Sequence, residues 1–309
     1  FPRMSPPPSP PRPLKPAAGT LTAGAAALGL AACVTNVEPA LPPGWEEITP
    51  PAQADIQALV PEGVDHITVG TNPPFPPFQF KEPGGQIVGF EMDLARAVAA
   101  TMGLDFSIRE QEFSLILPAV DAGTIEFGAS GFTDTPERQE NYDFVDFIYA
   151  GLQWSKPVDG DDVDPEHPCG LTVAVQRTTV AETDEARPKD EACQAAGEDP
   201  VEVLAYDTND AAATAAIVGR ADAFIADAPV IAWAMERSEG RLEPIGEQLD
   251  AAPYGFALAK DSELTDAVLA AMDYLIESGY YEEILAQWNI EDGLLTEPML
   301  NAKPAASAG

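Results

Sequence analysis

The stretch FGASGFTDTPERQENYDFVDF, from Phe127 to Phe147, decides the fold. It begins within a short apolar run, residues 125–129, which is typical of a buried strand. A turn follows, then Thr135 as a good helix N-cap and Pro136 where the first turn of a helix tolerates proline. Arg138 lies in that first turn. Free N–H groups and a guanidinium at one point favour carboxylate binding, although ordinary capping beside a solvated arginine explains the same spacing.

The same stretch resembles the signature of the extracellular solute-binding proteins, family 3, which serve amino-acid ABC importers. The segment GFEMDLARA (residues 89–97) and the ending at Tyr280–Trp288 resemble the family too, so the resemblance extends from about Ile67 to Ile290. It implies an α/β protein with a two-lobe periplasmic-binding-protein fold (type II), whose lobes are joined by two crossover strands.

The expected division of the chain follows from this resemblance and from composition. It is a signal peptide with a lipobox at 1–33, a Pro-rich tether at 34–60, lobe 1 at 61–153 and 254–296, lobe 2 at 154–253, and a disordered tail at 297–309.

The resemblance implies a site for a free amino acid between the lobes. Ser130, Gly131, Thr133 and Arg138 would hold the α-carboxylate, as the matching residues do in the family. Asp227 would bind the α-ammonium from the other lobe. It ends a predicted strand, a common place for ligand residues in open α/β sheets, although an Asp before Pro229 also suits helix capping.

Aromatic residues are expected at the mouth of this site. Phe75 follows the strand at residues 66–71 in a proline-stiffened loop, and the matching family residue often covers the ligand. Phe113 matches a second aromatic residue of the family at the ligand. Plain core packing is the alternative for both. Asn72 stands where the family often has Asp, and this neutral residue disfavours a cationic ligand side chain.

A second strand-to-helix junction is expected at Gln176–Glu182, and it resembles the ligand loop of the family's second lobe. Gln176 and Thr179 match ligand-binding positions there, while Thr178 replaces the usual glycine. Arg177 pairs with an acidic ligand side chain if it turns inward and is a surface residue if it turns outward. The predicted ligand is therefore a polar or acidic amino acid.

The net charge of −35 disfavours nucleic acid as a partner. Walker, Rossmann and zinc motifs are absent from the sequence, so neither a cofactor nor a metal ion is predicted. Cys169 and Cys193 are expected to form a disulfide, because an exported protein with two cysteines beside a lipid-bearing one most simply pairs them. A metal pair is the alternative, and His66 and His167 are the only histidines available to it.

The N-terminal residues predict export. Three basic residues precede an uncharged stretch at 17–30, and Leu30–Cys33 resembles the lipobox in which cysteine is lipidated. A non-cleaved apolar N-terminus is the alternative. The expected protein is a monomeric lipoprotein on the outer face of the cell membrane, which passes its amino acid to an ABC permease.

Two other functions compete with this one. An enzyme on the same scaffold, such as a dehydratase of a small carboxylic acid, would need a general acid or base aimed at the substrate. The expected site contains no histidine, cysteine or glutamate, so a non-enzyme is predicted. A ligand-sensing module is the third possibility, and it would want an attached signalling domain.

Overall fold

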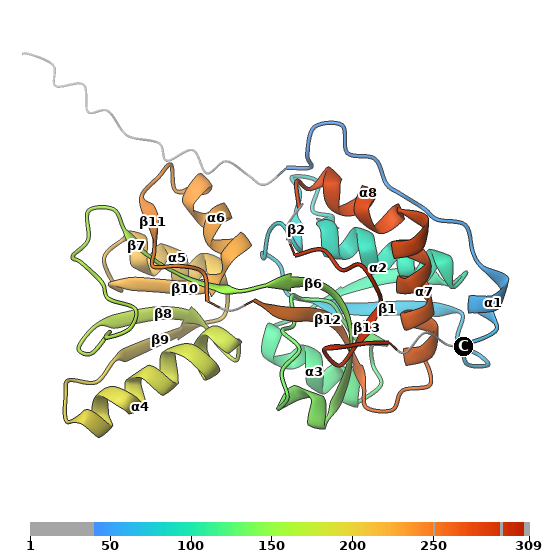
Figure 1. Ribbon diagram of the computed structural model, residues 1–309. Helices are drawn as coiled ribbons and strands as arrows, with labels where there is room; N and C mark the ends of the chain where they lie inside the picture. The colour runs from blue at the N-terminus through green and yellow to red at the C-terminus, as the bar shows by residue number, and fades with distance from the viewer. Residues whose placement is uncertain (1–39, 250, 291–292, 306–309) are drawn as a thin grey trace, which may run out of the picture. The chain divides into compact units, whose positions relative to one another are not determined.

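The computed structural model describes residues 40–249, 251–290 and 293–305, which belong to one compact unit. Their strands form a seven-stranded sheet, a five-stranded sheet and a two-stranded ribbon (Figure 1). None of the helices in these residues combines the length and apolar character that a membrane crossing requires. The predicted leader and Cys33 lie outside the described residues.

Lobe 1 is built on the seven-stranded sheet, whose order is β14-β13-β6-β12-β5-β1-β4. Its strands are β1 (His66–Thr71), β4 (Asp105–Glu110), β5 (Phe127–Gly128), β6 (Tyr142–Ala150), β12 (Ala252–Ala259), β13 (Met299–Leu300) and β14 (Lys303–Pro304). The ribbon pairs β2 (Phe80–Lys81) with β3 (Ile87–Val88). The helical elements of this lobe are α1 (Ala54–Gln57), α2 (Phe90–Thr101), α3 (Phe113–Asp121), η1 (Arg138–Glu140), α7 (Thr265–Ser278) and α8 (Tyr280–Gln287).

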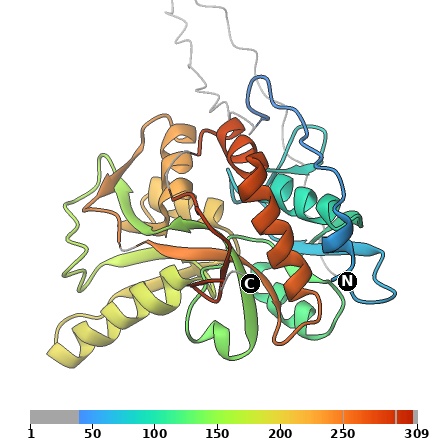
Figure 2. The ribbon, with the colours of Figure 1, turned by 45° about the vertical axis from the view of Figure 1, so that its right-hand side comes forward.

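The sequence of helix α7 has the apolar spacing of one helical face, at Leu264, Val268, Met272 and Leu275. All four residues are buried. They pack with α2 and α8 over the sheet, and Figure 2 brings the red-orange helices α7 and α8 forward. Gly279 ends α7 in the left-handed conformation (φ 83°), which glycine adopts without a steric penalty.

Lobe 2 is built on the five-stranded sheet, whose order is β11-β7-β10-β8-β9. Its strands are β7 (Leu152–Pro157), β8 (Thr172–Gln176), β9 (Glu202–Tyr206), β10 (Ala223–Asp227) and β11 (Leu242–Ile245). The π-helical turn η2 (Ala181–Ala186) leads into α4 (Arg187–Ala196), and α5 (Asn209–Ile217) and α6 (Ala228–Arg237) complete the lobe. Pro188 lies at the junction of η2 and α4, where its missing N–H explains the wider turn.

Two neighbouring crossings join the lobes, as predicted. The chain leaves lobe 1 between β6 and β7 at Gly151 and returns between β11 and β12. The two connections touch, since Leu249 N donates to Leu152 O at 2.8 Å and a side chain at Gly151 would collide with the Leu249 carbonyl. In Figure 1, β6 and β12 run from one group of elements to the other.

Three expectations need correction. The helix expected after Thr135 is only the short 3-10 turn η1, although Thr135 Oγ1 does accept from Arg138 N at 3.2 Å. The expected disordered tail contains β13 and β14, and β13 pairs with β6. The tether folds onto lobe 1 where it is described: Trp45 Nε1 donates to Asp93 Oδ2 at 2.8 Å. The tail is ordered because β13 pairs with the edge of β6, and the tether is ordered because Trp45 donates to a buried carboxylate.

Candidate ligand-binding site

A pocket lies between the lobes, where the parallel strands of both sheets end. Asn72 follows β1, Ser130 follows β5, Gln176 ends β8 and Asp227 ends β10. Ligand sites in open α/β sheets form outside these carboxyl ends, because the chain turns there and exposes polar groups. The described lining is Asn72, Phe75, Phe113, Ser130, Gly131, Thr133, Arg138, Leu152, Gln176, Thr179, Val180, Ala181, Asn209, Ala226 and Asp227.

Arg138 spans the two lobes at one end of the pocket. Its Nη1 donates to Thr133 O at 2.8 Å within lobe 1, and its Nη2 donates to Thr178 O of lobe 2 at 3.3 Å. The guanidinium also lies over the Phe132 ring, 5.6 Å from its centroid. Burial lowers the pKa of Arg138 from its usual value, and the charges of Asp184 and Asp227 oppose that change. The side chain is held ready for a carboxylate by contacts to backbone carbonyls.

Ser130 and Gly131 are engaged by lobe 1 itself. Ser130 Oγ accepts from Asn72 N at 3.0 Å and from Gln79 Nε2 at 2.9 Å, which leaves its O–H free to donate. Gly131 N–H donates to both oxygens of Glu91, at 2.9 and 3.1 Å. Burial raises the pKa of Glu91 to about 8, against the effect of the Gly131 bond. Gly131 lines the pocket, but its N–H is not free for a ligand carboxylate.

A chain of side-chain amides crosses the pocket. Asn209 Nδ2 donates to Gln176 Oε1 at 2.9 Å, and Gln176 Nε2 donates to Asn72 Oδ1 at 2.8 Å. Asn72 Nδ2 in turn donates to Gln111 O at 3.0 Å. These three side chains are buried, and the chain links β8 and α5 of lobe 2 to the end of β1 in lobe 1. It offers amide oxygens to a ligand, since each can accept a second hydrogen bond.

Asp227 is the buried carboxyl group of lobe 2 in the pocket. It lies at the N-cap position of α6, without a capping bond from its side chain, and Tyr254 of β12 donates its hydroxyl to Asp227 Oδ1. Burial raises the pKa of Asp227 to about 7, although its own backbone N–H and the charge of Arg138 lower it. Because Arg138 acts on this carboxyl, one cationic and one acidic side chain from different lobes face the same small volume.

The aromatic residues form walls of the pocket. Phe75 is 6% exposed and covers Gly131 so closely that any side chain there would collide with its ring. Phe113 is 8% exposed and stacks on Phe132, with ring centroids 4.6 Å apart. Thr133 and Thr179 contribute from the two lobes, and Thr179 Oγ1 donates to Gln176 O at 2.7 Å. Both phenylalanines therefore combine core packing with exposure to the pocket.

Comparison with known proteins gives the family. Residues 67–291 match the family model of the bacterial extracellular solute-binding proteins, family 3. The chain belongs to this family. As a family 3 protein it is 55% identical to the arginine-binding protein ArgT of Corynebacterium glutamicum over 296 residues, which cover 94% of this chain and 97% of that protein.

Solved structures have the same fold. An ancestral arginine-binding protein bound to arginine aligns with a TM-score of 0.66 and 30% identity, covering 72% of this chain and 98% of its own. An ancestral amino acid-binding protein described as a precursor of cyclohexadienyl dehydratase aligns with a TM-score of 0.63 and 28% identity, over 72% of this chain and 95% of its own. The two-lobe periplasmic-binding-protein fold predicted for this family 3 protein is thereby confirmed.

The structure brings together every predicted ligand residue except Arg177. Arg177 Nε lies 2.7 Å from Asp207 Oδ1, its Nη2 donates to Ala205 O at 3.0 Å, and its side chain is 47% exposed. Sequence reasoning missed Asn209, at the start of α5. The strand β9 was not expected, and with it the rule that ligand residues follow strand ends would have pointed to Asn209.

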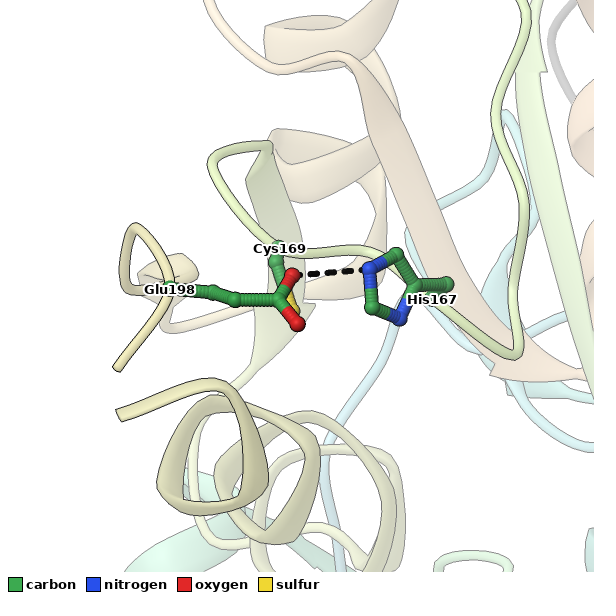
Figure 3. A group of neighbouring side chains, drawn as sticks. All are labelled: His167, Cys169 and Glu198. Carbon is green, nitrogen blue, oxygen red and sulfur yellow. Dashed lines mark ion pairs between the residues drawn. The ribbon is translucent and has the colours of Figure 1, made fainter. Parts of the chain in front are cut away.

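The cysteine pair of this family 3 protein lies in lobe 2. Cys169 and Cys193 form the expected disulfide, with Cα atoms 5.5 Å apart. Cys169 also lies beside His167 and Glu198, and Figure 3 shows the ion pair between the last two, whose Nε2 and Oε2 are 2.8 Å apart. Because the Cys169 sulfur is bonded to Cys193, it is not the thiolate that a metal ion would need.

Proposed function

We propose that this protein captures free L-arginine, an amino acid with a basic side chain, between its lobes and delivers it to an ABC permease. One observation carries the proposal. Arg138 and Asp227 come from different lobes and meet at one pocket, so each satisfies one end of a zwitterion. A ligand held at both ends favours closure of the lobes, because neither lobe alone provides both charges.

The side chain of the ligand is the finer question, and the pocket chemistry supports a cation. The described lining has no basic residue besides Arg138, because Arg177 turns outward to Asp207. An acidic ligand side chain would thus lack a partner. The amide oxygens of Asn72 and Gln176 can accept from a guanidinium, and Phe75 and Phe113 line the same pocket, where an aromatic ring can attract a planar cation.

This proposal departs from the polar or acidic ligand expected from sequence. That expectation rested on the neutral Asn72 and on the chance that Arg177 faces the ligand. The relative with 55% identity is named as an arginine-binding protein, which adds support for arginine. Cys33 as a lipid anchor, the permease and the monomeric state are parts of the same proposal, and they rest on the family and on the leader-like residues 1–33.

Titration calorimetry on the purified chain, refolded to remove any bound amino acid, tests the function. We expect L-arginine to bind more tightly than glutamine or histidine and L-glutamate not to bind. Arg138→Ala and Asp227→Ala should each abolish binding, because each leaves one ligand charge unpaired. Arg177→Ala is the matched control and should bind as the wild type does. Tight binding of glutamate, or unchanged affinity in the Arg138 variant, would contradict the proposal.

The alternative function, an enzyme, can be tested by an activity assay on the same purified proteins. Among the described residues of the pocket there is no histidine, cysteine or glutamate to act as general acid or base. The aligned structure with a dehydratase in its title is itself described as an amino acid-binding protein. Release of water from prephenate-like acids by the wild type, absent from Asp227→Asn, would favour the enzyme instead.

A further inference from the structure

Two buried carboxyl groups meet at the base of the ligand loop, outside the pocket. Asp134 is 4% exposed and Asp146 is fully buried. Asp134 follows Thr133 in the loop that leads to Arg138, and Asp146 lies in the crossover strand β6. Neither residue lines the pocket, so binding of a ligand does not use them directly.

Each carboxyl group has one satisfied oxygen and one bare oxygen. Asp134 Oδ1 accepts from Gln139 Nε2 at 2.8 Å, and Asp146 Oδ2 accepts from Ala302 N at 3.0 Å. Asp134 Oδ2 and Asp146 Oδ1 are buried and find no donor among the described residues. Asp134 and Asp146 lie on neighbouring segments, because Asp134 N donates to Pro253 O and Asp146 pairs with Gly255, two positions further along β12. A hydrogen bond between the two bare oxygens would require a proton on one of the carboxyl groups.

The backbone of β12 packs closely against Asp146. Gly255 of β12 is paired with Asp146, and a Cβ there would lie 2.7 Å from Asp146 Oδ1 and 3.0 Å from the Val145 carbonyl. Ala302, between β13 and β14, contacts Asp146 from the hairpin through the bond from its N–H to Oδ2. Two ionised carboxylates in such a site repel each other and remain unsolvated, so the proton is retained.

We propose that Asp134 and Asp146 share one proton and that this pair positions the Thr133–Arg138 ligand loop on the crossover strands. The backbone supports this role. Asp134 N donates to Pro253 O at 2.8 Å, Gly255 N donates to Phe132 O at 3.0 Å, and Thr133 forms a bridge with Tyr254. The loop that carries Arg138 is thus attached to β12 by its backbone and to β6 by the shared proton.

The charged groups around the pair define its titration. Arg138 and Glu137 lie on the loop, Asp143 on β6, Lys260 after β12, and Lys303 on β14. Asp143 is held by Lys260 at 2.8 Å, and Tyr254 gives its hydroxyl to Asp227. Burial, followed by the charge of Asp134, raises the pKa of Asp146 to about 8. Burial also raises the pKa of Asp134, and the charge of Arg138 lowers it.

Loss of the shared proton would change the ligand loop. The pair would then hold two negative charges, and Asp134 would attract Arg138 more strongly in competition with the carboxylate of the ligand. Affinity for an α-amino acid should therefore fall at alkaline pH. This consequence rests on the proposed function, whereas the shared proton itself does not.

Unfolding of the full chain without ligand tests the proton. Asp146→Asn and Asp134→Asn each keep a hydrogen bond between the side chains, because an amide N–H replaces the proton. We expect the melting temperature of the wild type to fall more steeply than that of either variant from about pH 6 to about pH 9.5. Asp161→Asn is the control, because it removes the same charge at an exposed position. Its melting temperature should change with pH as that of the wild type does. Parallel curves for the wild type and both Asn variants would overturn the shared proton.

Calorimetry with L-arginine over the same range tests the positioning role. The wild type should lose about tenfold in affinity relative to Asp146→Asn as the pair ionises, and titration of the ligand cancels in that ratio. A constant ratio would overturn the positioning role even where the unfolding curves support the proton. Failure of any amino acid to bind would contradict the proposed function and leave the unfolding test to decide the shared proton.

Discussion

At the scale of single residues, the protonation of Asp227 should make the affinity for the ligand depend on pH. Burial raises the pKa of Asp227 to about 7, so the neutral form dominates below that value. An α-ammonium group favours the ionised form, and binding must then expel the proton. We expect the affinity for L-arginine to fall by up to about tenfold for each pH unit below 7.

Calorimetry at about pH 5, 6 and 7.5 measures this dependence, and buffers of different ionisation enthalpy report the released proton. Asp227→Asn keeps the shape of the side chain and removes its titration. This variant should bind weakly with little pH dependence over the same range. A wild type whose affinity stays level between these values would disagree with the assignment of the α-ammonium to Asp227.

Thr178 is a second residue of interest, because its backbone conformation costs free energy in the folded protein. It stands where the resemblance predicts glycine, and its φ of 61° is in the left-handed region, which β-branched residues rarely adopt. Its carbonyl accepts from Arg138, so the strained backbone serves the contact between the lobes. Thr178→Gly should raise the free energy of unfolding by about 1 kcal/mol.

Urea denaturation at neutral pH measures the Thr178 effect. Thr179→Gly is the control: Thr179 is not among the residues of positive φ, so glycine there adds freedom to the unfolded chain and removes the hydrogen bond from Thr179 to Gln176 O, with no strain to relieve. That variant should lose stability. If both glycine variants lose stability equally, the left-handed backbone at residue 178 carries no strain.

At the scale of elements, the resemblance to the family implied ligand positions that the fold brings to one pocket. Asn72, Ser130, Gln176 and Asp227 each lie at or just after the end of a short strand, and the two sheets bring those strand ends together. The amphipathic helix α7 could also be predicted from sequence, because its apolar residues have the spacing of one helical face.

Other elements depend on partners distant in sequence. Strands β13 and β14 are two residues each, and β13 exists because the edge of β6 provides hydrogen bonds. Strand β9 has only partly buried or exposed residues, and the sequence analysis did not predict it. The direction of Arg177 was set by Asp207, thirty positions along the chain, which no local pattern reveals.

The disulfide ties the loop before β8 to helix α4. Cys169 and Cys193 are 24 residues apart, and the buried Cys193 packs in the core of lobe 2 with Trp154 and Val173. Replacing both cysteines by serine should lower the free energy of unfolding by about 3 kcal/mol in the chain-entropy account. Affinity for the ligand should persist, because neither cysteine lines the pocket.

Chemical denaturation of that double variant with calorimetry beside it gives both quantities. Wild-type protein treated with a dithiol reductant is the matching sample. A stability equal to that of the wild type, or loss of binding at full helical content, would count against a purely structural disulfide.

At the scale of the whole molecule, the charge of −35 opposes compactness. Excess negative charges repel one another, and salt screens that repulsion over a Debye length of about 10 Å at 0.1 M. We expect the melting temperature at pH 8 to rise by several degrees between about 0.02 and 0.5 M NaCl. The rise should be smaller near pH 4.5, where many carboxylates are protonated. An unchanged or lower midpoint in salt would mean that ion pairs outweigh the repulsion.

The buried acids should shape the stability of the molecule over pH. Burial raises the pKa of Glu91 and of Asp146 to about 8 each, above their values in the unfolded chain. A carboxyl group with a raised pKa contributes stability that is complete below its unfolded pKa and is lost as pH rises through its folded pKa. The molecule should therefore be most stable on the acidic side of neutrality.

The hairpin of β13 and β14 makes the protein suitable as an optical sensor. Its strand β13 pairs with β6, the strand that leads into one of the two crossings between the lobes, and Lys303 of β14 is exposed and outside the pocket. A polarity-sensitive dye attached at that lysine would lie beside β6. With lobes that close as proposed, its fluorescence would report amino-acid capture in real time without occupying the pocket.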